Sequence, residues 1–362
     1  MLEIAPRHEG AQTMRFDFHE LALSNLAANK PVHFRTLARI PTPSADLQTY
    51  GTFGPLKRGD VAATALSGSF QLRQGDLSSY KMIGGIFTAA GRFKGTLGRV
   101  ELAGTTQIPN FEVTSARHPL ALSAEYETIV NGTSGDVTIA SAAVHFLDST
   151  LSAQGSISGR HGKTVSLDVD TRAGRVQDLL RLFVSSDKPP LKGVINFHAH
   201  VVLPPIHERF LKKVRLDGEF DITGGEFVKP GSQRKVDELS ARASGKKALI
   251  KTMGGPPRVS SEWKATVRLR DAVARMSNAT FAVPGAVSRG SGTYDLPRQA
   301  INLAGHLVMD ASLSKAASGV KSLLLIPLDP FFKKRGAGAV VPVRVMGTYS
   351  HPRFKASLRE HN

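Results

Sequence analysis

Apolar and polar residues alternate in several segments of this chain, and this period of two restricts the fold more than any other feature of the sequence. In VRLDGEFDI, residues 214–222, the apolar residues and a glycine occupy one parity and the charged residues occupy the other. Successive side chains of a β-strand point to opposite faces of the sheet, so the segment predicts a strand with one dry and one wet face. The same pattern recurs in TVSLDVD, ATVRLR, VPVRV and FDFHEL.

Turn signals separate these segments. Examples are Asn131-Gly132, Gly224-Gly225 and Pro284-Gly285, and the whole chain of 362 residues contains 34 glycines and 20 prolines. Dipeptides of this kind form tight turns, and strands that tight turns connect are antiparallel neighbours. We therefore predict a mostly β chain with an antiparallel sheet.

Helical periodicity is confined to three short segments, at about residues 174–186, 232–243 and 312–328. In the first, Val176, Leu179, Leu180 and Phe183 follow the spacing of one helical face. The last contains an apolar stripe and ends near Pro327, because proline disrupts a helix interior. These segments predict two or three short α-helices beside the sheet.

Charge and cysteine content limit the classes of function. The formal net charge of +17 favours polyanionic partners, which are nucleic acid or an anionic lipid surface. Without any cysteine, the chain has no disulfides, no thiolate chemistry and no cysteine-built metal site. No run of about 18 apolar residues and no apolar core of a leader peptide occurs, so we predict neither a transmembrane helix nor a signal peptide in this chain.

No motif in the sequence predicts an active site. His198 and His200 share one strand face, yet no acidic residue at a suitable spacing completes a metal site. Gly162-Lys163-Thr164 lacks the first glycine of a phosphate loop, and we interpret it as a hairpin turn. Asp168 and Asp170 are expected on a solvated strand face. We predict no catalytic residues, no metal, no cofactor and no enzymatic activity.

Cationic residues are dispersed along the sequence, with one compact cluster. Nucleic-acid modules usually concentrate cations among aromatic residues, so no specific nucleic-acid partner is predicted. The cluster joins an aromatic pair to three cations, which suits contact with an anionic membrane surface, although the two rings can instead pack into the core. Its residues are Phe331, Phe332, Lys333, Lys334 and Arg335.

Long blocks of the sequence resemble the C-terminal region of the AsmA-like family of bacterial envelope proteins. The blocks include LSGSFQLRQGDLSSYKMIGGIFTAAGRFKGTLGRVELAGTTQIPNFEV, GRVQDLLRLFVSSDKPPLKGVINF and KSLLLIPLDPFFKKRGAGAVVPVRVMGTYSHPRF. The resemblance extends from about Leu47 to Leu358. It implies an elongated groove made by the curled sheet, with regions 1–46 (N-terminal strands), 47–310 (the groove) and 311–362 (a closing helix and strands). Relatives usually begin with a membrane helix, which we do not expect in this sequence.

The family resemblance also implies a function. Relatives are periplasm-facing, membrane-associated proteins of the cell envelope that support outer-membrane assembly and move lipid, so phospholipid or another acyl lipid is the expected partner. An anionic membrane surface and other envelope proteins are further partners to expect, and a scaffold acting through its sheet edges is the alternative function. The expected groove lining is Val165, Leu167, Val169, Val214, Leu216, Phe220, Ile222, Val267, Leu269, Val341 and Val343.

Overall fold

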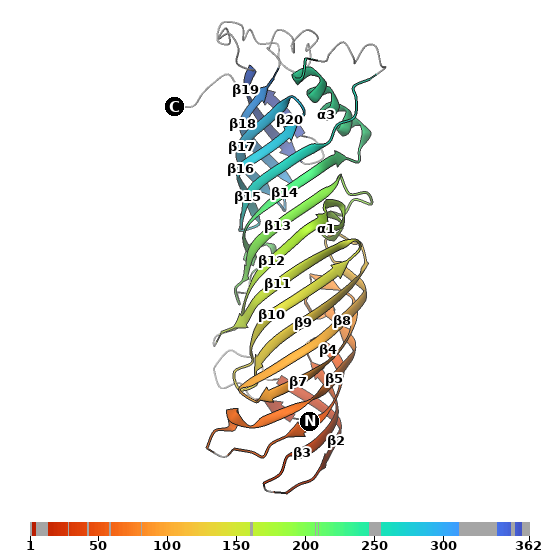
Figure 1. Cartoon of the computed structure of the whole chain (residues 1–362), viewed down its shortest axis with the longest axis vertical. Coiled ribbons are helices and arrows are strands. Elements are labelled where there is room, and N and C mark those ends of the chain that lie inside the picture. The colour runs from red at the N-terminus through yellow and green to blue at the C-terminus, as the bar shows by residue number, and fades with distance from the viewer. Residues whose placement is uncertain are drawn as a thin grey trace. The chain divides into compact units, whose positions relative to one another are not determined.

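Figure 1 shows the computed structural model of the chain, which describes residues 2–4, 14–27, 29–41, 43–57, 59–80, 82–159, 162–206, 208, 210–245, 255–310, 339–348 and 352–356. Contacts divide the chain into two compact units. Unit 1 comprises Met1–Gly174, Asp178–Asp187 and His200–Phe210, and unit 2 comprises Arg175–Gln177, Lys188–Ala199 and Leu211–Asn362.

The strands of unit 1 follow one another in sequence as an antiparallel meander from β2 to β12, apart from two short strands. Of these, β1 pairs with β2, and β6 pairs with β8 while β5 pairs directly with β7. The strands are β1 (Leu2–Ile4), β2 (Met14–Ser24), β3 (Val32–Pro41), β4 (Ser44–Phe53), β5 (Ala65–Asp76), β6 (Ile83–Gly84), β7 (Ile86–Thr96), β8 (Arg99–Val113), β9 (Leu120–Asn131), β10 (Asp136–Phe146), β11 (Ser149–Ser158) and β12 (Thr164–Arg175).

Unit 2 contains a second run of strands, each antiparallel to the next from β14 to β20. They are β14 (Arg215–Phe227), β15 (Ser261–Arg270), β16 (Val273–Val283), β17 (Ala286–Asp295), β18 (Ala300–Met309), β19 (Ala339–Thr348) and β20 (Pro352–Ala356). Strand β13 (Leu191–Leu203) contributes residues to both units. The prediction of a mostly β, antiparallel and curled sheet is confirmed.

Helices are short, as predicted. They are α1 (Val176–Phe183), α2 (Phe210–Lys213) and α3 (Pro230–Ala243), with 3-10 turns at Val61–Ala63 and Leu77–Tyr80. The first two predicted helices correspond to α1 and α3, and the third, at 312–328, lies outside the described residues. Within the part of the chain that the structure describes, no helix has the length and apolar character needed to cross a membrane.

Helix α3 begins and ends where its sequence dictates. Pro230 occupies the first helical position, where its missing N–H group costs no hydrogen bond. Gly245 follows the helix with a φ of 71°, a left-handed conformation that glycine adopts without steric cost. The sequence predicts this helix at about 232–243, and the structure has it begin two residues earlier, at Pro230.

Facing glycines allow neighbouring strands of unit 2 to approach closely. Gly290 on β17 lies directly opposite Gly305 on β18. A Cβ atom added to Gly290 would stand 2.2 Å from the Ala304 carbonyl oxygen and 2.8 Å from the Cα of Gly305. Both obstacles are backbone atoms, so a side chain at Gly290 requires the two strands to move apart.

Replacing Gly290 by valine is therefore expected to lower the free energy of unfolding by about 1–3 kcal/mol, the usual range for overpacking. Trp263, the sole tryptophan, belongs to unit 2, so its fluorescence during urea unfolding measures the effect. Ser291→Ala is the matched control, because Ser291 is the exposed neighbour on the same strand. Equal unfolding midpoints for the two variants would contradict this account of the close approach.

Candidate functional site

One face of the sheet in unit 2 is apolar, and we call it the apolar face of unit 2. Cross-strand partners in an antiparallel sheet lie on the same face, so the strand register identifies its members. Leu216 lies opposite Leu269, which lies opposite Ala274, and the row continues through Tyr294 and Ile301. The next row is Gly218, Val267, Met276, Gly292, Leu303 and Val345.

Unit 1 has an apolar face of the same construction. One of its rows crosses nine paired strands, from β12 to β3, and at a spacing of about 4.8 Å per strand it extends roughly 38 Å. The row consists of Val165, Ile157, Val137, Val130, Val100, Gly95, Leu66, Phe53 and Val32.

The rows of unit 2 remain partly accessible to solvent, unlike the residues of a packed core. Leu216, Leu269 and Ile301 are all of intermediate burial. Full burial on the apolar face of unit 2 is concentrated at one end, where Val236 and Leu239 of α3 pack against the sheet. The buried residues there are Ala243, Val283, Ala286, Met309 and Val341. Helix α3 thus covers one end of this face.

The structure places the predicted lining residues in three settings. Val165, Leu167 and Val169 lie opposite Ile157, Gly155 and Ala153 on the apolar face of unit 1. On the apolar face of unit 2, the cross-strand register brings together Leu216, Phe220, Ile222, Val267 and Leu269, and buried Val214 precedes them in sequence. The third setting is the cluster at α3, which contains Val341 and Val343.

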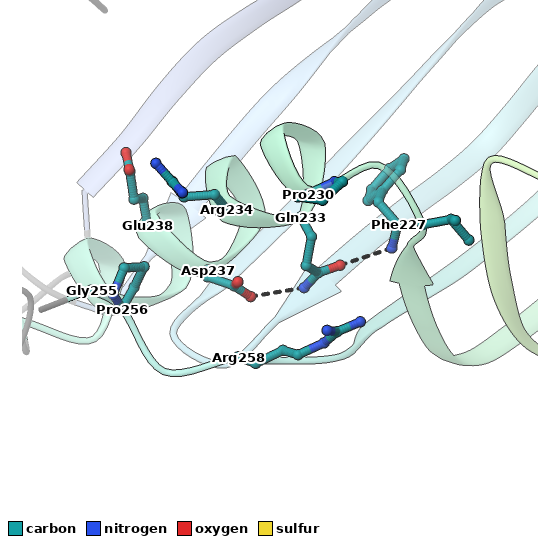
Figure 2. Close-up of a pocket in the computed structure, with 10 residues that line it drawn as sticks. Phe227, Pro230, Gln233, Arg234, Asp237, Glu238, Gly255, Pro256 and Arg258 are labelled. Atoms are coloured by element: carbon teal, nitrogen blue, oxygen red, sulfur yellow. Dashed lines mark hydrogen bonds between the residues drawn. The ribbon is translucent and has the colours of Figure 1, made fainter. Parts of the chain in front are cut away.

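Polar contacts fix α3 to the loops around it (Figure 2). The Gln233 side chain accepts a hydrogen bond of 2.8 Å from the Phe227 backbone N–H and donates one of 2.8 Å to the Asp237 carboxylate. The same Asp237 oxygen accepts a 2.9 Å bond from the Val259 backbone N–H. At the other end of α3, the Ser240 hydroxyl donates to the Pro284 carbonyl oxygen at 2.7 Å. These hydrogen bonds hold α3 over one end of the apolar face of unit 2.

A depression of about 520 Å³ lies beside α3, and charged groups line much of it. Figure 2 shows Arg234 and Glu238 on the helix, with Arg258 on the facing loop. Arg258 donates a 2.6 Å hydrogen bond to Glu226, so its charge is compensated. An acyl chain bound here would remove water from these charged groups, and its own burial does not offset that cost. The depression therefore does not suit an acyl chain.

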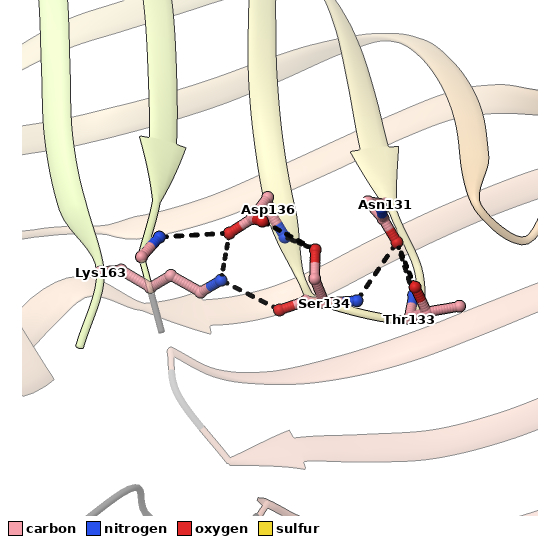
Figure 3. A network of polar contacts seen from close by, with 6 residues as sticks. Asn131, Thr133, Ser134, Asp136 and Lys163 are labelled. Atoms are coloured by element: carbon pink, nitrogen blue, oxygen red, sulfur yellow. Dashed lines mark hydrogen bonds and ion pairs between the residues drawn. The ribbon is translucent and has the colours of Figure 1, made fainter. Parts of the chain in front are cut away.

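Lys163 has a structural role in joining two hairpin turns (Figure 3). Its ammonium group lies 2.6 Å from an Asp136 carboxylate oxygen and 3.0 Å from the Ser134 carbonyl oxygen. Two hydrogen bonds lower the pKa of Asp136 below its usual value, and the one from Lys163 has a larger effect than the one from the Ser134 hydroxyl. The Asn131 side chain accepts bonds from Thr133 and Ser134 in the adjacent turn. The predicted turns at Asn131 and Lys163 are confirmed.

Three polar side chains that the sequence did not connect meet on the opposite face of unit 1. His200 Nδ1 lies 2.7 Å from Asp168 Oδ1, and His200 Nε2 lies 3.3 Å from Ser166 Oγ. Acid, imidazole and hydroxyl thus occur in the order used by serine hydrolases. Strand N–H groups lie in the plane of the sheet, so β12 directs no backbone donor outward to stabilise an oxyanion. The trio has the geometry of a surface hydrogen-bond chain.

No group of three or more metal-binding side chains suitable for an ion occurs among the described residues. The predicted membrane contact, Phe331 to Arg335, lies outside them. Comparisons of the chain with protein-family models, with curated proteins and with solved structures gave no match.

Proposed function

We propose that this chain is a non-enzymatic, lipid-handling protein of the AsmA-like type in the cell envelope, which binds acyl chains along the apolar faces of its units. The observation that carries the proposal is the partial accessibility of long apolar rows, such as Leu216, Leu269, Ala274, Tyr294 and Ile301. Surface of this kind gains stability when an apolar ligand covers it.

The dimensions and chemistry of the rows favour an acyl chain as the ligand. Each CH₂ group removed from water contributes about 0.8 kcal/mol. Half of a bilayer's hydrocarbon core is roughly 15 Å thick, which corresponds to about three strand spacings along a row. Glycines such as Gly218 and Gly292 alternate with larger side chains along the rows. The rows therefore have shallow depressions that a flexible chain can fill. The envelope location and the role in outer-membrane assembly are supported by the sequence resemblance.

Lipid extraction from the purified chain tests the proposal. We expect mass spectrometry to find phospholipid or another acyl lipid with the parent protein, and about half as much with Leu216→Glu/Leu269→Glu, because charge on both sides of one cross-strand pair repels an acyl chain from unit 2 and leaves the apolar face of unit 1 unchanged. The matched control is Thr266→Glu/Ser277→Glu, a cross-strand pair on the opposite face. Circular dichroism establishes that each variant is folded.

Two outcomes would contradict acyl binding. An unchanged amount of lipid on the folded Leu216/Leu269 variant would contradict binding on the apolar face of unit 2. A parent protein that carries no lipid, and acquires none from mixed micelles, would favour the scaffold function, in which the sheet edges bind other envelope proteins.

A further inference from the structure

The charges on the second face of unit 2, opposite its apolar face, are unevenly distributed. We call this side the charged face of unit 2. On β14 and β15 its acids and bases neutralise one another. Arg268 lies 2.8 Å from Asp217, Arg270 also pairs with Asp217, and Lys264 lies 2.8 Å from Asp221. These ion pairs leave little net charge on that part of the face.

Strands β16 to β19 differ, because their cations have no acidic partners among the residues that the structure describes. Arg275, Arg289 and Arg344 are all exposed, and none of them forms an ion pair with a described residue. Arg344 donates to the neutral side chain of Asn302 at 3.2 Å. The single acid in these four strands, Asp295, is paired with Arg298 at 2.9 Å. Three positive charges without a described acidic partner therefore lie on three of these four neighbouring strands.

A partly exposed apolar row lies on the same face, next to the row that contains Arg289. Val287 lies opposite Val308, which lies opposite Val340, and the next row in register contains Arg289 and His306. Val308 is 41% exposed and Val340 is 38% exposed. Cations beside exposed aliphatic side chains match the boundary between lipid headgroups and acyl chains.

We propose that the charged face of unit 2, at β16 to β19, docks on the surface of an anionic lipid bilayer, with Arg275, Arg289 and Arg344 on the headgroup phosphates and the valine row at the interface. Arginine binds phosphate oxygens through paired N–H donors. A nucleic acid fits less well, since the aromatic side chains of these strands, Phe281 and Tyr294, belong to rows of the apolar face and are not available for base stacking. This docking does not depend on acyl binding by the apolar face.

Vesicle co-sedimentation of the full chain tests the docking surface. The vesicles are phosphatidylcholine alone or phosphatidylcholine with phosphatidylglycerol, at physiological salt. We expect Arg275→Gln/Arg289→Gln/Arg344→Gln to bind the anionic vesicles roughly 100-fold more weakly than the parent, because each cation near an anionic surface contributes about 1 kcal/mol. Val308→Glu is expected to weaken the same binding through the valine row.

The matched control removes the same number of exposed cations from unit 1, as Arg35→Gln/Arg92→Gln/Lys94→Gln. There Lys94 lies directly opposite Glu101, and Glu127 shares a row with Arg92, so we expect a loss below about tenfold. Equal losses in the two triple variants would overturn the proposal, because net charge alone would then explain binding. Failure of the parent to bind, or displacement from vesicles by stoichiometric duplex DNA, would also overturn it. Lipid extracted from the folded unit 2 variant is expected to equal that of the parent, which separates docking from acyl binding.

Discussion

Replacing Trp263 by alanine is expected to lower the free energy of unfolding of unit 2 by about 3–5 kcal/mol, the usual cost of truncating a large aromatic residue in a packed region. The indole ring lies edge-on to two other rings, with centroids 4.6 Å from Phe281 and 6.1 Å from Phe227. Its N–H donates to the Ser261 hydroxyl at 2.9 Å, and this fully buried serine donates to the Gly225 carbonyl oxygen at 2.8 Å. One side chain thus connects β14, β15 and β16.

Urea unfolding followed by far-ultraviolet circular dichroism measures this loss, since the variant has no tryptophan. Trp263→Phe is the control, because it keeps a ring between Phe227 and Phe281 and removes only the N–H donor. A cost of about 1 kcal/mol is expected for it, the net value of one hydrogen bond. If the phenylalanine variant is as unstable as the alanine variant, the hydrogen bond to Ser261, rather than aromatic packing, dominates at this position.

Alternation in the sequence was sufficient to predict which residues share a face. Leu216, Phe220, Val267 and Leu269 were assigned to one side from parity alone, and the register places them there. The face on which a residue lies is a local property of its strand, because successive side chains point to opposite faces of the sheet. The predicted faces therefore did not require knowledge of the neighbouring strands.

The sequence did not predict which residues of neighbouring strands lie opposite each other. The cations looked dispersed, but Arg275, Arg289 and Arg344 gather on neighbouring strands once the register is known. That register depends on turn lengths and on irregularities such as the shift between Met276 and Ala279, which periodicity does not reveal. Likewise, Ser166 and His200 are 34 residues apart in sequence and meet only because β13 places His200 beside β12.

Replacing Asp237 by alanine is expected to destabilise the attachment of α3 by about 3 kcal/mol, because it removes the acceptor of one Gln233 N–H and of the part-buried Val259 N–H. Asp237 is 7% exposed, and a single carboxylate oxygen accepts both the Gln233 amide and the Val259 backbone N–H. Loss of these bonds weakens the link between the helix and the loop that precedes β15. The apolar end of the sheet beneath Val236 and Leu239 then becomes exposed more often.

Two measurements follow this change in the Asp237 variant, namely the urea midpoint from Trp263 fluorescence and the binding of a dye that detects exposed apolar surface. Asp237→Asn is the discriminating control, because its amide oxygen can accept both hydrogen bonds while the negative charge is removed. We expect the asparagine variant to lie within about 1 kcal/mol of the parent and to bind no additional dye. A large loss in the asparagine variant would mean that α3 is held by the charge of Asp237 and not by its acceptor geometry. Similar dye binding by the alanine variant and the parent would mean that the remaining contacts, which are the packing of Val236 and Leu239 and the Ser240 bond to Pro284, keep the helix in place.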